Sequence, residues 1–161
     1  MDRLSGKSIL VAGGGFIGGE LAFRYASEGA QILIGDLNLA NAQKIADKIT
    51  NAKGSALAVQ LDGTDEASIE AAVATCCERI GRLDGLHVNF ASFADGAPDS
   101  GVTDLPLAAY DETMEVNARG YVLCTRHALK ALIASGGGSI VYTSSAAAYL
   151  SEADTLRLCD E

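Results

Sequence analysis

A glycine-rich segment near the amino terminus is the first place where residue types and spacing could do chemistry. Gly13, Gly15 and Gly18 form the pattern G-x-G-x-x-G between an apolar run and apolar residues at helical spacing, which is the context that gives the pattern meaning. Gly13 permits a tight turn, Gly15 lets the backbone approach a pyrophosphate, and Gly18 lets the helix pack on the strand. A dinucleotide is therefore expected here, with Phe16 and Ile17 among its contacts. The alternative is a glycine-rich turn that binds nothing.

A carboxylate, Asp36, stands 18 residues after Gly18, at the end of the next apolar run. Such a carboxylate can accept hydrogen bonds from both hydroxyls of the adenosine ribose, and it repels a 2′-phosphate. No Arg or Lys among residues 37–40 offsets that repulsion. We therefore expect NAD rather than NADP, with Leu37 beside the cofactor. The alternative is that Asp36 caps the helix that follows.

These residues are positioned by strands and helices that alternate along the whole chain. Apolar runs predict strands at 8–12, 31–35, 56–61, within 83–91, and at 139–143. Helical periodicity predicts helices at about 17–26, 39–49, 69–80 and 110–134. This alternation implies right-handed crossovers and a parallel sheet. The expected fold class is α/β, a Rossmann-type doubly wound sheet of order 3-2-1-4-5, with the ligand crevice at the carboxyl ends of strands 1 and 4.

Length and composition limit the possible partners. The chain of 161 residues predicts a single domain, 1–161, with an irregular tail from about 146 to 161. Twelve basic and 21 acidic residues give a net charge of −9, which disfavours nucleic acid and anionic membranes. Neither a signal peptide nor a membrane span is expected. Four cysteines without zinc-site spacing predict reduced thiols, a cytoplasmic location and no metal site.

Further segments line up with one family: from about Leu4 to about Ala148 the chain resembles the short-chain dehydrogenase/reductase family. The segment Q-L-D-G-T-D, residues 60–65, is similar to the family's acidic motif after the third strand. This likeness implies that Asp62 contacts the adenine, with Gly63 beside it. The segment L-H-V-N-F-A-S, residues 86–92, is similar to the family's N-N-A-G motif. Asn89 and Ala91 match that motif and are expected to contact the cofactor, whereas other residues replace its second Asn and its Gly.

Two catalytic positions are implied by the same resemblance. Asn117 corresponds to the helix Asn that holds a water in the family's proton relay, and Ser145 corresponds to the catalytic Ser at the end of the fifth strand. Alternatively, Asn117 only bonds backbone within a kinked helix, and Ser145 is an ordinary turn residue. Neither histidine is expected to be catalytic: His87 would pack or meet solvent at the strand's edge, and His127 would face solvent.

The sequence departs from the family pattern at both ends. The glycine turn has Ala12 in place of the family's Thr and is one residue shorter, nearer the general fingerprint. After Ser145 the motif Y-x-x-x-K, which supplies the family's proton donor, is missing: the only later Tyr is Tyr149, and the last Lys is Lys130. The resemblance therefore implies a form truncated at its carboxyl end, with an incomplete sheet whose fifth strand is an exposed edge.

The function implied is hydride transfer between a nicotinamide cofactor and a small secondary alcohol or carbonyl compound. Without the Tyr and Lys, the alternatives are a catalytically inactive dinucleotide-binding module and a remnant without stable affinity for a ligand. The resemblance also implies a homo-oligomer formed through the long helix 110–134.

Overall fold

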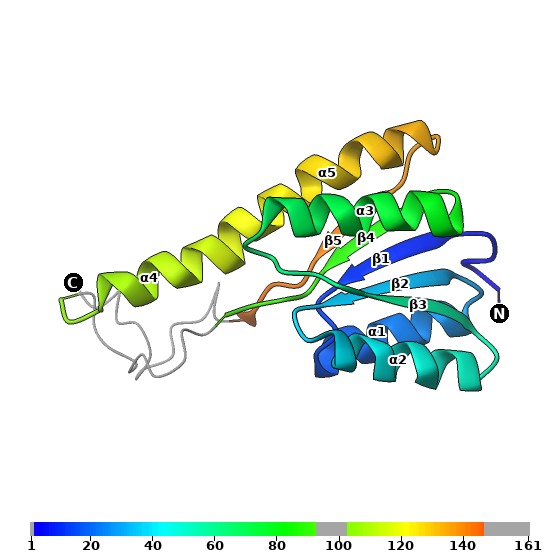
Figure 1. Cartoon of the computed structure of the whole chain (residues 1–161), viewed down its shortest axis with the longest axis horizontal. Coiled ribbons are helices and arrows are strands. Elements are labelled where there is room, and N and C mark those ends of the chain that lie inside the picture. Colours follow the sequence, from blue (N-terminus) through cyan, green and yellow to red (C-terminus); the bar gives the residue numbers. More distant parts are fainter. Residues whose placement is uncertain (1, 93–102, 147–161) are drawn as a thin grey trace.

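The computed structural model describes residues 2–92 and 103–146 and is built on one parallel sheet. The sheet has five strands in the order β3-β2-β1-β4-β5, as the sequence predicts. Every pair of neighbouring strands is parallel, so all carboxyl ends lie at one edge of the sheet, the edge beyond which α4 projects in Figure 1. The strands are β1 (Ser8–Ala12), β2 (Gln31–Asp36), β3 (Ser55–Gln60), β4 (Gly85–Val88) and β5 (Ser139–Tyr142).

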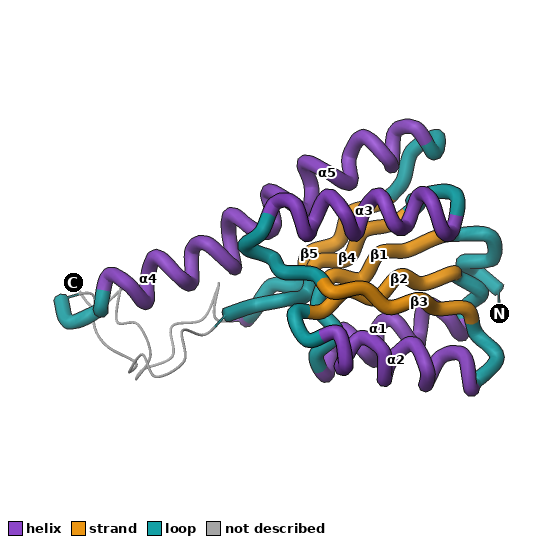
Figure 2. Tube along the Cα trace, viewed as in Figure 1, coloured by secondary structure: helices purple, strands orange, loops and turns teal. Residues whose placement is uncertain are grey.

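Helices cover both faces of this sheet. Figures 1 and 2 show α1 and α2 on one face and α3 and α5 on the other, which is the doubly wound arrangement expected from the alternation. The helices are α1 (Phe16–Ser27), α2 (Leu39–Asn51), α3 (Glu66–Ile80), α4 (Leu107–Met114) and α5 (Gly120–Ala134). None of the helices within residues 2–92 and 103–146 is both long enough and apolar enough to cross a bilayer.

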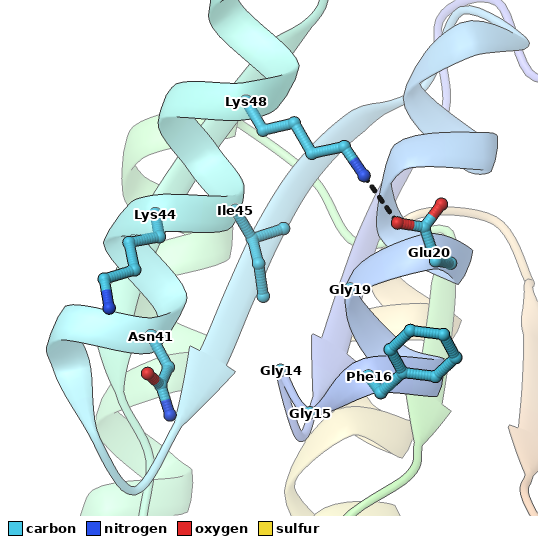
Figure 3. Close-up of a pocket in the computed structure, with 9 residues that line it drawn as sticks. All are labelled: Gly14, Gly15, Phe16, Gly19, Glu20, Asn41, Lys44, Ile45 and Lys48. Atoms are coloured by element: carbon cyan, nitrogen blue, oxygen red, sulfur yellow. Dashed lines mark hydrogen bonds and ion pairs between the residues drawn. The ribbon is translucent and has the colours of Figure 1, made fainter.

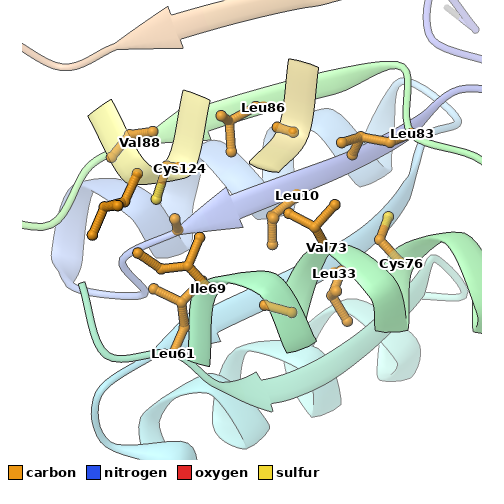
Figure 4. Packing of buried hydrophobic residues seen from close by; sticks show 14 of the residues in the cluster. Leu10, Leu33, Leu61, Ile69, Val73, Cys76, Leu83, Leu86, Val88 and Cys124 are labelled. Carbon is orange, nitrogen blue, oxygen red and sulfur yellow. The ribbon is translucent and has the colours of Figure 1, made fainter. Parts of the chain in front are cut away.

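Two hydrophobic cores result, one on each face. β1 is buried along its whole length, and its side chains alternate between the two cores: Leu10 packs toward α3 and α5, and Val11 packs toward α1 and α2. Figure 4 shows the first of these cores, in which side chains from the strands meet Ile69 of α3 and Cys124 of α5. A fully buried aliphatic side chain stabilises the fold by about 1.5–3 kcal/mol. The two cores therefore anchor β1, the strand that leads into the glycine turn.

Several element boundaries differ from the sequence prediction. The long helix begins at Leu107 rather than near 110, and a π-helical segment, Glu115–Arg119, separates α4 from α5. A π segment inserts one extra residue per turn, which a period-3.6 pattern cannot reveal. The fourth strand is confined to Gly85–Val88. The predicted tail, 146–161, lies outside the described residues except for its first residue.

Candidate functional site

A large cleft of about 1700 Å³ lies at the carboxyl ends of the strands. All but one of the site residues expected from the sequence line it: Gly13, Gly15, Phe16, Ile17, Asp36, Leu37, Asp62, Gly63, Asn89, Ala91, Asn117 and Ser145. The exception is Gly18, which is buried in the first turn of α1. Residues from the two halves of the chain thus meet around one cavity. This cavity lies at the carboxyl ends of the strands, where a sheet of this strand order is expected to bind its ligand.

The three glycines of the turn differ in their surroundings. Gly13 has a φ of 106°, and a Cβ there would lie 2.5 Å from the Phe90 amide nitrogen. A Cβ at Gly18 would lie 1.8 Å from the Gly13 carbonyl oxygen. At Gly15, by contrast, a Cβ would meet nothing within 4 Å. Gly13 and Gly18 are therefore required by the chain's own packing, whereas Gly15 leaves open space at the cleft.

The amino terminus of α1 opens into this cleft without a side-chain cap. Gly15 is its N-cap residue, no side chain accepts a hydrogen bond from its first turn, and that turn contains no acidic residue. The neighbouring helices are capped: Asn38 accepts from the Ala40 amide in α2, and Asp65 accepts from the Ala67 amide in α3. The first N–H groups of a helix and its dipole favour an anion.

Asp36 ends β2 with its carboxylate at the glycine turn. Its Oδ2 accepts a hydrogen bond from the Gly14 amide at 2.8 Å, and its Oδ1 accepts one from the Asn38 amide at 2.9 Å. The alternative that Asp36 caps the next helix is wrong, because Asn38 is the N-cap of α2. Each carboxylate oxygen can accept more than one hydrogen bond. The carboxylate therefore keeps acceptor capacity for hydroxyls in the cleft.

A second, smaller hollow of about 330 Å³ adjoins the turn and is drawn in Figure 3. Gly14, Gly15 and the highly exposed Phe16 form one side of it, and α2 contributes Asn41, Lys44 and Lys48 to the other. Lys48 is paired with Glu20 of α1. Lys44 lies beyond residues 37–40, the segment directly after Asp36, and helical spacing brings it back to the turn.

Asp62 holds the loop between β3 and α3. Its Oδ1 accepts hydrogen bonds from the Thr64 amide at 2.9 Å and the Thr64 hydroxyl at 2.7 Å. The adjacent Gly63 has no room for a side chain, because a Cβ there would lie 2.7 Å from the Phe90 ring. Asp62 therefore shapes this wall of the cleft through its own loop.

Phe90, which replaces an Asn of the resembled motif, lines the cleft. Its ring lies edge-on to Tyr121, with ring centroids 5.3 Å apart. A Cβ at Gly120 would lie 2.9 Å from the same ring, so two glycines, Gly63 and Gly120, leave the space that Phe90 occupies. The Tyr121 hydroxyl donates to the Phe90 carbonyl at 3.0 Å. Sequence reasoning missed this cluster because its members are far apart along the chain.

Asn117 lies in the π-helical segment and binds the loop after β4. Its Oδ1 accepts from the Ser92 amide and its Nδ2 donates to the Ser92 carbonyl, both at 2.8 Å. The backbone that it contacts therefore belongs to a different element, not to its own helix. The two hydrogen bonds fasten the loop that carries Ala91 to the long helix.

The end of β5 carries Ser145 and Thr143 to the other side of the same cleft. The Thr143 hydroxyl donates to Asn89 Oδ1 at 2.8 Å. His87 of β4 lies behind them and is only 6% exposed, so it packs inside and does not meet solvent. The expectation that His127 faces solvent is wrong: its side chain is 17% exposed, and its Nε2 lies 3.0 Å from Glu66 Oε1. This hydrogen bond lowers the pKa of Glu66.

The cysteines in the part of the chain that the structure describes are free thiols. Burial raises the pKa of Cys76 and that of Cys124 to about 12. These thiols therefore stay protonated and belong to the core. Across residues 2–92 and 103–146, no three His, Cys, Asp or Glu side chains gather where they could hold a metal ion.

Comparison with known proteins matches this architecture to one family. The family described as short chain dehydrogenase matches residues 7–155. The chain is 38% identical over 149 residues to short-chain dehydrogenase reductase 5 of Arabidopsis thaliana, covering 91% of this chain and 56% of that protein. It is 37% identical over 153 residues to sorbitol dehydrogenase of Cereibacter sphaeroides, covering 94% and 57%. The chain thus spans little more than half the length of these curated relatives.

A solved structure agrees with the sequence comparisons. The complex of 7α-hydroxysteroid dehydrogenase with NADH and 7-oxo glycochenodeoxycholic acid superimposes with a TM-score of 0.85 at 28% identity, covering 94% of this chain and 58% of that one. The strand order, the cleft and the matched residues all point the same way, and the chain belongs to the short-chain dehydrogenase family.

Proposed function

We propose that this chain binds NAD in the cleft at the carboxyl ends of its strands. We further propose that the protein transfers a hydride between the nicotinamide and a small secondary alcohol or carbonyl compound. The observation that carries the proposal is the uncapped amino terminus of α1, which meets the carboxylate of Asp36 across Gly14. One end of this arrangement suits a pyrophosphate, and the other suits the hydroxyls of a ribose.

The surroundings of Gly15 support the pyrophosphate site. A Cβ there would project into open space, and Gly15 lines the cleft together with Phe16 and Ile17. A phosphate could therefore approach the backbone closely enough to accept hydrogen bonds from the first N–H groups of α1. No Lys or Arg is needed for this, because the helix terminus supplies both the donors and the positive end of the dipole.

The carboxylate of Asp36 supports NAD over NADP. A 2′-phosphate placed at the ribose would lie against a negative charge. Lys44 in the adjoining hollow is the feature that could oppose this preference, since it brings a positive charge to the same side of the turn. We propose that Asp36 outweighs it, because its carboxylate contacts the turn itself through the Gly14 amide.

When bound, the nicotinamide ring would donate a hydride to a carbonyl carbon in its reduced form, or accept one from an alcohol carbon in its oxidised form. For the substrate, we propose that the Ser145 hydroxyl donates a hydrogen bond to the reacting oxygen, since Ser145 lines the cleft where β5 ends. Asn117 corresponds to the Asn of the family's proton relay, whose Tyr and Lys motif this sequence does not contain. Its side chain also fastens the loop after β4, a wall of the cleft, to the long helix through both hydrogen bonds to Ser92.

A titration of the purified chain with NADH and with NADPH tests the proposal. We expect saturable binding of NADH and at least about tenfold weaker binding of NADPH. The reason is the charge of Asp36 against the 2′-phosphate, since a difference of about 1.4 kcal/mol in binding free energy corresponds to a factor of ten in affinity. Asp36→Asn should weaken the binding of NADH and narrow the difference in affinity between NADH and NADPH. Asp47→Asn, on the exposed face of α2, makes the same change of charge and is the control. Equal affinity of the unmodified chain for both cofactors would contradict the NAD assignment.

An assay of alcohol oxidation and carbonyl reduction on the same samples separates the catalytic proposal from cofactor binding. Binding with turnover supports the oxidoreductase. Binding without turnover supports the alternative, a dinucleotide-binding module. Absence of both contradicts the cofactor site itself.

We also propose a cytoplasmic location and self-association through the long helix. Three free thiols, Cys76, Cys77 and Cys124, suit a reducing compartment. Exposed apolar side chains on α5, Val122, Leu129 and Ile133, support an interface along that helix.

A further inference from the structure

A part-buried chain of hydrogen bonds runs from α1 through β4 and the end of β5 to the cleft. The Tyr25 hydroxyl lies 2.8 Å from His87 Nδ1, His87 Nε2 lies 3.0 Å from Thr143 Oγ1, and Thr143 Oγ1 donates to Asn89 Oδ1 at 2.8 Å. We call these four residues the His87 relay. They come from α1, β4, the end of β5 and the loop after β4, and neither the glycine pattern nor the catalytic positions account for them.

The donors and acceptors of the His87 relay can be assigned from its cleft end. An amide oxygen only accepts, so the single hydroxyl proton of Thr143 is used on Asn89. The Thr143 oxygen must then accept from His87, which places a proton on Nε2. Nδ1 of the neutral ring carries a lone pair and accepts from the Tyr25 hydroxyl. Burial lowers the pKa of His87, which favours the neutral ring that this assignment needs.

The cleft end of the relay touches the turn that the cofactor needs. With Oδ1 of Asn89 turned to Thr143, its Nδ2 lies on the other side, 2.9 Å from where a Cβ of Gly18 would stand. The Gly13 carbonyl oxygen lies 1.8 Å from the same point. The backbone amide of Asn89 also donates to the Ala12 carbonyl at 2.8 Å. The Asn89 carboxamide is therefore packed against the underside of the glycine turn.

We propose that His87 is a positioning residue for dinucleotide binding. Through Thr143 it fixes the rotation of the Asn89 carboxamide, and Asn89 in turn supports the turn at Gly18 from which α1 presents its N–H groups. Tyr25 completes a closed path, because it lies near the carboxyl end of α1, whose first turn contains Gly18. The inference rests on the proposed function, since its effect is on the affinity for the dinucleotide.

Two substitutions of Thr143 isolate the relay without touching the imidazole. Thr143→Val keeps the shape of the side chain and removes the hydroxyl, whereas Thr143→Ser keeps the hydroxyl. We expect Thr143→Val to raise the dissociation constant for NADH about tenfold, the effect of losing one buried hydrogen bond, and Thr143→Ser to stay within about twofold of the unmodified chain. Calorimetric titration with NADH at a temperature where all three proteins are folded gives these constants.

A spectroscopic readout checks the assignment independently of the cofactor. Nitrogen-15 chemical shifts of the imidazole of His87 should report the Nε2–H tautomer in the unmodified chain and in Thr143→Ser. In Thr143→Val the preference of His87 for the Nε2–H tautomer should weaken, because the hydroxyl oxygen that accepts the Nε2 proton is gone. An Nδ1–H tautomer in the unmodified chain overturns the inference.

The two proposals fail in different ways. If the unmodified chain binds NADH and Thr143→Val binds it equally well, the His87 relay does not position the turn, and the proposed function stands. If a lower melting temperature accompanies unchanged affinity, the relay is only structural, and the inference is again overturned. If the unmodified chain binds no NADH, the proposed function fails and the inference fails with it.

Discussion

Gly15 and Gly18 show how two glycines of one motif are required for different reasons. Gly18 has no room for a methyl group, since a Cβ would overlap the Gly13 carbonyl oxygen, whereas the space beside Gly15 is empty. The backbone of Gly15 has a φ of −62°, which alanine adopts freely. The fold therefore explains Gly18, whereas packing does not require Gly15, as expected if a ligand approaches its backbone.

The two alanine variants should separate these roles. Gly18→Ala should lower the free energy of unfolding by about 2 kcal/mol or more, because an overpacked site forces the backbone to shift. Gly15→Ala should leave stability unchanged or raise it by up to about 1 kcal/mol through the unfolded state, while weakening NADH binding at least about tenfold. Urea denaturation and NADH titration of both variants measure this. Unchanged affinity in Gly15→Ala would contradict the proposed pyrophosphate site.

At the scale of the elements, an ionic cluster joins β1 to β4 at the edge opposite the cleft. The buried Asp84 carboxylate accepts hydrogen bonds from the Ser8 amide at 3.0 Å, from Arg82 Nε at 2.8 Å and from Lys7 Nζ at 3.3 Å. Burial alone would raise the pKa of Asp84, but these hydrogen bonds outweigh burial and lower it. The cluster holds the two strands whose other ends carry Gly13 and Asn89.

Replacing this carboxylate should change the pH dependence of stability. Because the pKa of Asp84 is lower in the folded than in the unfolded chain, its ionised form stabilises the fold above the unfolded-state value of about 4, and this stabilisation is lost as the pH falls below it. Asp84→Asn should therefore lower the free energy of unfolding by about 1–3 kcal/mol at pH 7 and by less at pH 3. Chemical denaturation at both pH values checks this. Asp2→Asn, an exposed change of equal charge, is the control, and a pH-independent difference would contradict the account.

Sequence reasoning reached the strand order, the glycine turn and Asp36, because these depend on local periodicity and on short spacings. It missed the π-helical segment that carries Asn117, because the change from an α-helical to a π-helical turn leaves no apolar period of its own. It also missed Phe90 against Gly63 and the His87 relay. Those arrangements join residues from distant segments, and only the packed sheet brings them together.

On the surface of the molecule, three large apolar side chains of α5 are exposed, with the exposed Arg126 among them. Val122 is 65% exposed and Ile133 is 67% exposed, and Leu129 lies exposed between them. An apolar stripe on a helix that already covers one face of the sheet is typical of a surface that meets another protein. A second copy of this chain could bury the same stripe symmetrically.

Self-association through this stripe should be sensitive to charge. We expect the unmodified chain to have the mass of an oligomer by light scattering, and Ile133→Glu to shift it toward the monomer with an unchanged melting temperature. Lys130→Glu, at an exposed polar position of the same helix, should leave the mass unchanged. A monomeric unmodified chain, or equal masses for all three proteins, would contradict the proposed interface.

A crystal structure of the chain grown with NADH tests the cofactor site most directly. We expect the pyrophosphate within hydrogen-bond distance of the backbone amides at the start of α1, and the adenosine ribose hydroxyls on the carboxylate of Asp36. A dinucleotide bound away from this turn, or a ribose directed away from Asp36, would contradict the cofactor site and the chemistry inferred from it.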